Sequence, residues 1–79
     1  MKARIKVMLK KGVLDPQGKA IQGALGSMGF AGVEGVRQGK YFEVDLIETD
    51  KSKAMSTVKA MCDKLIANTV IENYEIELA

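Results

Sequence analysis

The residues of this chain that could do chemistry are a few carboxylates, several lysines and one cysteine, since histidine is absent. Without histidine there is no usual acid–base group near pH 7, no Ser–His or Cys–His nucleophile pair and no His-containing zinc site. Cys62 stands alone in an apolar helical pattern, which predicts a buried structural thiol. The sequence therefore predicts no catalytic, cofactor-binding or metal-ligating residue.

Asp15 is the carboxylate that could act as a general base, but Pro16 follows it directly. An Asp-Pro pair is typical of a helix start, with the aspartate as N-cap and the proline at the first helical position. Four other acidic residues alternate with apolar ones, which predicts solvated strand faces and not a catalytic pair: Glu43, Asp45, Glu75 and Glu77.

A basic loop and a basic turn are the candidate anion sites. Lys10, Lys11 and Gly12 lack the remaining residues of a Walker-type phosphate loop. Arg37, in the turn of residues 36–40, could hold an anion or simply solubilise the surface. A regulatory module that binds a small anionic metabolite at the first loop and the first helix start therefore remains open.

The elements that position these residues begin with a strand and a helix. Strict alternation over residues 3–9 predicts a half-buried strand, and helical spacing predicts a helix from Pro16 to a stop at Gly29. Three glycines inside this helix each cost about 1 kcal/mol relative to alanine. Either another backbone approaches them closely or a marginal helix tolerates them: Gly18, Gly23 and Gly26.

The rest of the chain predicts three more strands and a second helix. Residues 33–38 and 41–47 predict two strands joined as a hairpin by Gly39-Lys40. Thr49-Asp50 is expected to cap the helix and Asn68 to end it in a left-handed conformation. Its predicted buried stripe consists of Ala54, Met55, Val58, Met61, Cys62, Leu65 and Ile66, and residues 70–78 predict the last strand.

The element order β-α-β-β-α-β predicts an α+β, ferredoxin-like two-layer sandwich, an antiparallel sheet with two helices on one face. Residues 1–79 form one domain with a thin core, since small domains bury only about 60% of their extended surface. The topology places the first strand centrally. Its outward basic residues then face acidic neighbours on both sides: Lys2, Arg4 and Lys6 between Glu43 and Asp45, and Glu75 and Glu77.

Two surfaces are expected to contact other chains. Met8, Ile47 and Ile71 are predicted to gather at one end of the helix-free face and to mediate self-association. The loop and helix start from Leu14 to Gly18 are expected to contact a partner, because Leu14 is apolar in a surface connection. In the alternative, Leu14 packs against the helix as a staple and Asp15 is only a cap.

Composition excludes several other classes. The net charge of +2 reflects near balance, and only Tyr41 among the aromatics is expected to face outward on a central strand, so no nucleic-acid partner is predicted. No apolar run approaches the ~18 residues of a membrane helix, so no membrane partner is predicted either. A single cysteine fits a reducing compartment, and the chain is expected in the cytoplasm.

Three segments of the chain resemble the PurS family, the small subunits of phosphoribosylformylglycinamidine synthase in its multi-subunit form. The segments are residues 9–20 (LKKGVLDPQGKA), residues 36–40 (VRQGK) and residues 61–72 (MCDKLIANTVIE). They follow one another in the family's order and span most of the chain. One departure is Thr69, where the family commonly has proline.

The resemblance implies an accessory subunit of an enzyme of purine biosynthesis. The assembled ligase would use ATP and glutamine-derived ammonia to convert formylglycinamide ribonucleotide to the amidine. A large synthetase subunit would hold ATP, magnesium and substrate, and a glutaminase subunit would release ammonia. The small subunit would join them without catalysing a step itself, as a homodimer or higher oligomer. Its predicted partner interface consists of Leu14, Asp15, Pro16, Gln17, Gly18, Arg37 and Lys40.

Overall fold

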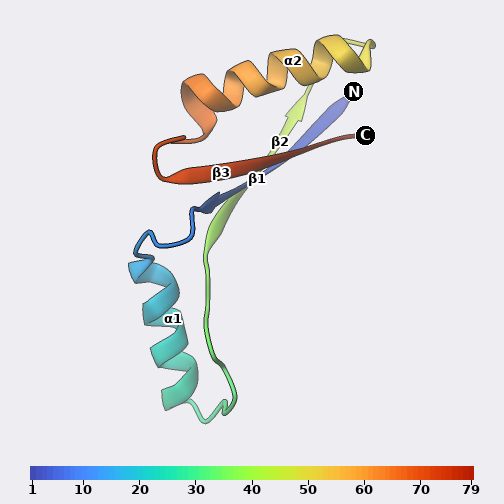
Figure 1. Ribbon diagram of the computed structural model, residues 1–79. Coiled ribbons are helices and arrows are strands. Elements are labelled where there is room, and N and C mark those ends of the chain that lie inside the picture. Colours follow the sequence, from blue (N-terminus) through green and yellow to red (C-terminus); the bar gives the residue numbers. More distant parts are fainter.

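The computed structural model describes all 79 residues, which form a three-stranded sheet and two long helices. The chain runs through β1 (Lys2–Leu9), α1 (Pro16–Ser27), β2 (Gly39–Asp45), α2 (Lys51–Met61), the π-helical turn η1 (Cys62–Ile66) and β3 (Glu72–Leu78). The strand order is β2-β1-β3, and both pairs are antiparallel. Figure 1 shows that α2 lies along the sheet whereas α1 projects beyond its end.

The central position of β1 confirms the charge pattern expected from the sequence. Arg4 lies opposite Glu43 on one side and Glu77 on the other. Arg4 Nη1 donates to Glu77 Oε1 at 3.1 Å, and Lys2 Nζ lies 3.4 Å from Glu43 Oε2. These pairs are exposed, and each contributes at most about 1 kcal/mol, but together they favour this register over its alternatives.

The core is small and lies between β1 and α2. Ala3, Ile5 and Val7 of β1 are fully buried, as are Val58 and Cys62. Half-buried apolar residues of the two outer strands pack around this cluster: Phe42, Val44 and Leu46, with Tyr74, Ile76 and Leu78. The three strands are therefore half-buried, with one face on the core and the predicted acidic faces of β2 and β3 in solvent.

The second helix begins as predicted and ends differently. Asp50 is its N-cap, and its carboxylate accepts hydrogen bonds from the N–H groups of Ser52 and Lys53. At the other end the backbone widens into η1, so Leu65 leaves the buried stripe and is 86% exposed. Asn68 is not left-handed; its side chain accepts a hydrogen bond from the N–H of Val70 within the turn. The predictions for Leu65 and Asn68 were therefore wrong.

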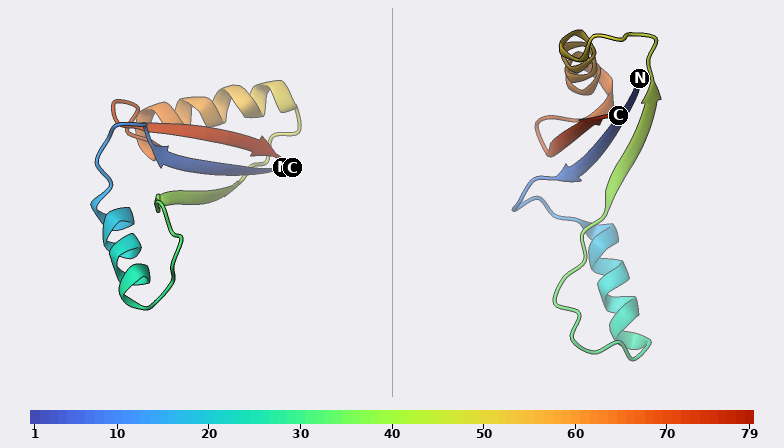
Figure 2. Two further views of the ribbon diagram at one scale, coloured as in Figure 1. Left: turned by 60° about the horizontal axis from the view of Figure 1, so that its bottom comes forward. Right: turned by 90° about the vertical axis from the view of Figure 1, so that its right-hand side faces the viewer.

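The predicted hairpin over residues 33–47 is also wrong. Gly39 and Lys40 lie inside β2 and pair with Met8 and Val7, so they form no turn. Residues 33–38 run alongside α1 without joining the sheet, and both segments extend away from it (Figure 2). The alternation in residues 33–38 indicates an extended strand, but no other segment of this chain is placed to pair with it.

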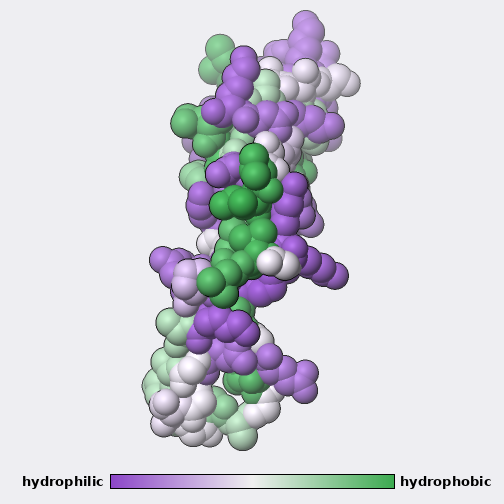
Figure 3. Space-filling view, turned by 60° about the vertical axis from the view of Figure 1, so that its left-hand side comes forward, coloured by the Kyte–Doolittle hydropathy of each residue, from purple (hydrophilic) through white to green (hydrophobic).

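The molecule thus has two parts, which we call the sheet body (β1, β2, α2, η1 and β3) and the arm (α1 with residues 28–38). The arm makes the chain elongated, 49 × 24 × 15 Å, with a radius of gyration of 16.0 Å. A compact chain of this length has a radius of about 12 Å. Hydrophobic side chains remain on the surface and form a band along one face (Figure 3). One chain alone therefore leaves much of its apolar surface uncovered.

Candidate partner interface

Asp15 connects the arm to the sheet body. Its Oδ1 accepts a hydrogen bond from the Gly18 N–H at 2.8 Å, which makes it the predicted N-cap of α1. Its Oδ2 accepts a second hydrogen bond from the Gln38 N–H at 2.9 Å, one residue before β2. The hydrogen bond from Gln38, followed by that from Gly18, holds the pKa of Asp15 below its ordinary value. Asp15 is therefore more than a cap.

A close backbone approach and an arginine complete this junction. Gly18 is the buried residue of α1, and a Cβ built on it would overlap the Val36 carbonyl oxygen and lie 2.7 Å from Asp15 Oδ2. Gly23 and Gly26 face open space, so close approach explains only the first of the three glycines. Arg37 donates a hydrogen bond to the carbonyl oxygen of Leu9, the last residue of β1.

Lys40 and Glu72 form an ion pair across the end of the sheet. Lys40 Nζ lies 3.2 Å from Glu72 Oε2, and Glu72 is 8% exposed. Glu72 Oε1 also accepts a hydrogen bond from the Asn68 N–H at 2.7 Å. This backbone hydrogen bond, with the contribution of Lys40, lowers the pKa of Glu72. The pair fastens the turn before β3 to β2.

The fold brings the predicted interface residues together at the junction. Asp15, Gln17 and Lys40 line one hollow of about 190 Å³. Leu14, Asp15 and Arg37 line a second hollow of about 360 Å³. Pro16 is exposed beside them, whereas Gly18 contacts Val36. Their contact with another chain stays a prediction.

Leu14 settles one alternative that the sequence left open. The side chain is 74% exposed and so does not pack as a staple against α1. An apolar residue this exposed on a loop held by Asp15 and Arg37 is available to a partner.

The residues expected to mediate self-association do not form one group. Met8 pairs with Gly39 at the end of β1, and Ile71 lies nearby, since its carbonyl oxygen accepts a hydrogen bond from the Lys10 N–H. Ile47 follows the opposite end of β2, beyond Asp45, and is fully exposed. Their predicted co-location was wrong because β2 is antiparallel to β1.

The remaining side chains that could be reactive have structural roles. Cys62 is buried, and burial raises the pKa of its thiol, which keeps it unreactive. The Tyr74 hydroxyl donates to Asp63 Oδ1 at 2.9 Å, and this hydrogen bond raises the pKa of Tyr74. No three acidic or cysteine side chains gather as metal ligands, and neither helix has the length and apolar character needed to cross a bilayer.

Known proteins resemble this chain over nearly its whole length. Residues 2–79 match the family model of PurS, described as phosphoribosylformylglycinamidine (FGAM) synthase. The PurS subunit of that synthase from Bacillus subtilis is 49% identical over 77 residues, which cover 98% of this chain and 90% of the relative. The PurS subunit from Synechocystis sp. is 49% identical over 75 residues, covering 95% of this chain and 75% of the relative.

Solved structures share the fold. The crystal structure of B. subtilis PurS has 50% sequence identity and a TM-score of 0.86, covering 96% of this chain and 94% of that chain. A chain of the PurLQS structure from Thermotoga maritima has 33% identity and a TM-score of 0.88, covering 96% and 93%. These likenesses confirm the α+β, ferredoxin-like class. They give no support to a free-standing regulatory module, because the named relatives are synthase subunits.

Proposed function

This chain belongs to the PurS family, and we propose that it is the non-catalytic part that joins the synthetase and glutaminase subunits of phosphoribosylformylglycinamidine synthase. Family membership makes it a subunit of this ligase of purine biosynthesis. The reaction of the assembled enzyme is the ATP- and glutamine-dependent conversion of formylglycinamide ribonucleotide to the amidine. We place ATP and magnesium in the synthetase subunit, none in this chain, and the whole assembly in the cytoplasm.

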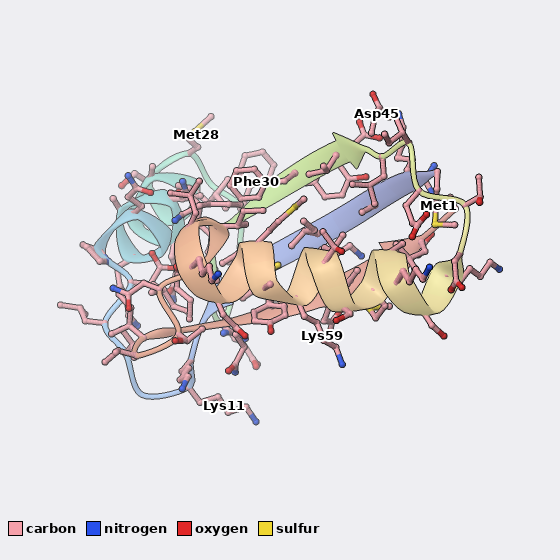
Figure 4. All side chains as sticks on the ribbon, turned by 90° about the horizontal axis from the view of Figure 1, so that it is seen from above. Met1, Lys11, Met28, Phe30, Asp45 and Lys59 are labelled. Atoms are coloured by element: carbon pink, nitrogen blue, oxygen red, sulfur yellow. The ribbon has the colours of Figure 1, made fainter.

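The observation that carries assembly with other chains is the uncovered arm. Apolar residues of α1 and of its C-terminal end are largely exposed: Ile21 by 41% and the C-cap residue Met28 by 71%, with Met28 extending away from the rest of the molecule (Figure 4). The whole chain exposes 5799 Å², about 1,100 Å² more than a compact protein of its mass. That surplus is comparable to one side of a standard protein–protein interface, about 800 Å².

Self-association accounts for part of this surface. Within the segment from Gly32 to Arg37, no backbone N–H finds an acceptor in this chain, and the only carbonyl that accepts is that of Glu34, from the Gln22 side chain. An extended edge of this kind is a template for strand pairing. We therefore assign the chain a homodimeric or higher state in which a second copy covers the arm.

The junction provides the surface for the other subunits. Leu14 and Gln17 stand on a loop whose conformation Asp15 and Arg37 fix, so the loop loses little entropy when it docks. Replacing Leu14 with serine and Gln17 with alanine removes both side chains without touching the hydrogen bonds of the junction. We expect the double variant to fold normally and to lower glutamine-dependent turnover of the reconstituted enzyme.

The decisive measurement combines stability with assembly. Thermal melting of the isolated variant and its affinity for the synthetase and glutaminase are compared with those of the parent and of Ser56→Ala, an exposed position on α2. A variant as stable as the parent that assembles with undiminished affinity excludes the interface. Steady ligase or glutaminase turnover by the isolated parent, above a contamination control, contradicts the non-catalytic role.

A further inference from the structure

A hollow of about 810 Å³ lies at the end of the sheet, mainly on the face that α2 leaves open. Its floor comes from the outward-facing residues of the strands, Met8 of β1 with Gly39 and Tyr41 of β2. Its border is basic and is drawn from four separate parts of the chain: Lys6, Lys10, Lys11, Arg37 and Lys40. The fold thus gathers cations that the near-balanced composition does not reveal, and we call this feature the basic groove.

Most of these cations have no carboxylate to neutralise them. Lys40 is paired with Glu72, but Lys6, Lys10 and Lys11 have no acidic group within 4.0 Å. Glu75 is the only carboxylate that lines the groove. It lies opposite Lys6 in the register, but the two side chains are not within ion-pair distance. Lys11 extends away from the ribbon into solvent (Figure 4).

The other end of the same sheet face is built differently. Lys2 and Arg4 are each within 4.0 Å of two carboxylates, so the positive charges at that end are neutralised within the chain itself. Along this face of the sheet, the surplus of positive charge therefore lies at the groove and not at the opposite end. Surplus positive charge next to apolar surface attracts negatively charged polypeptide and speeds its association.

The floor of the groove has the residue types that anchor protein interfaces. Tyr41 is 53% exposed, and Met8 lies beside it on the neighbouring strand. Gly39 keeps the floor open, because a Cβ there would lie 2.5 Å from the Val7 carbonyl oxygen and would overlap the Met8 side chain. Aromatic residues and methionine surrounded by charged residues are typical of interface centres.

We propose that the basic groove binds an acidic segment of a different polypeptide, a carboxylate-rich stretch that places an apolar side chain over Tyr41 and Met8. This inference rests on the proposed joining function and names the chemistry of one partner surface. Two grooves of two copies do not fit each other, because two-fold pairing of the grooves would bring unpaired lysines together. The carboxylates Glu43 and Glu77 of the same face are already engaged by Arg4.

The test uses a pair of double variants with equal change of charge. Lys10→Glu with Lys11→Glu reverses the groove, whereas Lys51→Glu with Lys59→Glu makes the same change on α2, which covers the opposite face. Affinity for the purified synthetase and glutaminase subunits is measured at low and high salt, after thermal melting has shown that each variant is folded. We expect the groove variant to bind at least about tenfold more weakly than the parent, the loss seen when a central interface residue is replaced. Its binding should also depend less on salt. The α2 variant should bind like the parent.

A second variant keeps the test decisive if charge reversal prevents folding. Tyr41→Ala is expected to weaken binding by about tenfold or more, and Tyr41→Phe to preserve it, because the ring and not the hydroxyl is the anchor. If the parent binds neither subunit, the proposed function and this inference both fail. If the parent binds and the groove variants bind equally well, the inference alone is overturned. The groove can also be tested with inorganic pyrophosphate. If pyrophosphate binds saturably, and the charge reversal at Lys10 and Lys11 abolishes this binding while subunit binding is unchanged, the inference is overturned and the groove binds a small anion.

Discussion

The sheet body and the arm obtain their stability in opposite ways. In the sheet body, β1 has a neighbour on each side and α2 on one face, and all the buried residues of the chain except Gly18 lie there or, in the case of Ala67, in the turn between η1 and β3. In the arm only Gly18 is buried, while apolar side chains such as Ile21 and Phe30 remain exposed. The difference shows that this sequence encodes one part that folds on its own contacts and another that depends on a partner.

The largest expected effect is the loss of stability when a buried side chain of the sheet body is shortened, compared with the same change in the arm. Ile5 is fully buried, so Ile5→Ala should lower the free energy of unfolding by about 2–5 kcal/mol. Ile21→Ala, in the arm, should lower it by less than about 0.5 kcal/mol in dilute solution, where no partner covers it. Urea unfolding at low and high protein concentration measures both.

The concentration dependence sharpens this comparison. If Ile21→Ala lowers the free energy of unfolding more at high protein concentration than at low, the arm lies in the contact between copies. Equal costs for the two substitutions in dilute solution contradict the division into a self-stabilised body and a dependent arm.

Two glycines of the same helix provide the next comparison. Gly18→Ala should lower the free energy of unfolding by about 1–3 kcal/mol, because its Cβ would press on the Val36 backbone. Gly23→Ala meets open space and should raise it by up to about 1 kcal/mol through better helix propensity. Thermal melting compares them, with Gly26→Ala as a second open position. If Gly23→Ala lowers the melting temperature of the dimer but not that of the monomer, that face of α1 lies against the second copy.

The smallest effect is a pH dependence at the junction. The folded pKa of Asp15 lies below the ordinary value of 3.8, so its contribution to stability is fully present above that value. It is lost as the pH falls through the folded pKa and Asp15 becomes protonated. The protection factor of the Gln38 amide against hydrogen exchange should therefore fall as the pH is lowered through the folded pKa of Asp15, and Asp15→Asn should remove this pH dependence.

Asp50→Asn is the matched control for this experiment. Asp50 caps α2 within the sheet body and accepts no hydrogen bond from the arm. Its replacement should leave exchange at Gln38 unchanged. A Gln38 amide that is equally protected in the parent and in Asp15→Asn at neutral pH excludes Asp15 as the connection between the two parts.

Local signals explain what could be predicted from the sequence. The caps Asp15 and Asp50 act within one helical turn, and the alternating charges of β1 matched its neighbours, so both were identified correctly. The strand predicted over residues 33–38 failed because periodicity indicates an extended conformation without indicating which chain supplies the partner. Leu65 was wrongly predicted to be buried because a π-helical turn shifts the buried face of the helix, and no pattern of residue types indicates that turn.

The candidate site shows the same limit. Leu14, Arg37 and Lys40 were predicted as interface residues from local features, an apolar residue in a surface loop and a basic turn, and their contact with a partner stays a prediction. The basic groove was missed because Lys6, Lys11 and Tyr41 become neighbours only when β1 pairs with β2. Net charge averages over the chain, whereas a binding surface depends on where the charges meet.

The central position of β1 also has a kinetic consequence. The amino group of Met1 donates to the Leu46 carbonyl oxygen across 45 positions, and Arg4 reaches Glu77 across 73. Contacts this distant require large loops to close before they stabilise anything, which slows folding. Because β3 follows β1, α1, β2 and α2 in the chain, β1 gains its second neighbour only after all of these elements have been synthesised. The helix of the arm, whose contacts are local, can form and fray within about a microsecond while the sheet is still incomplete.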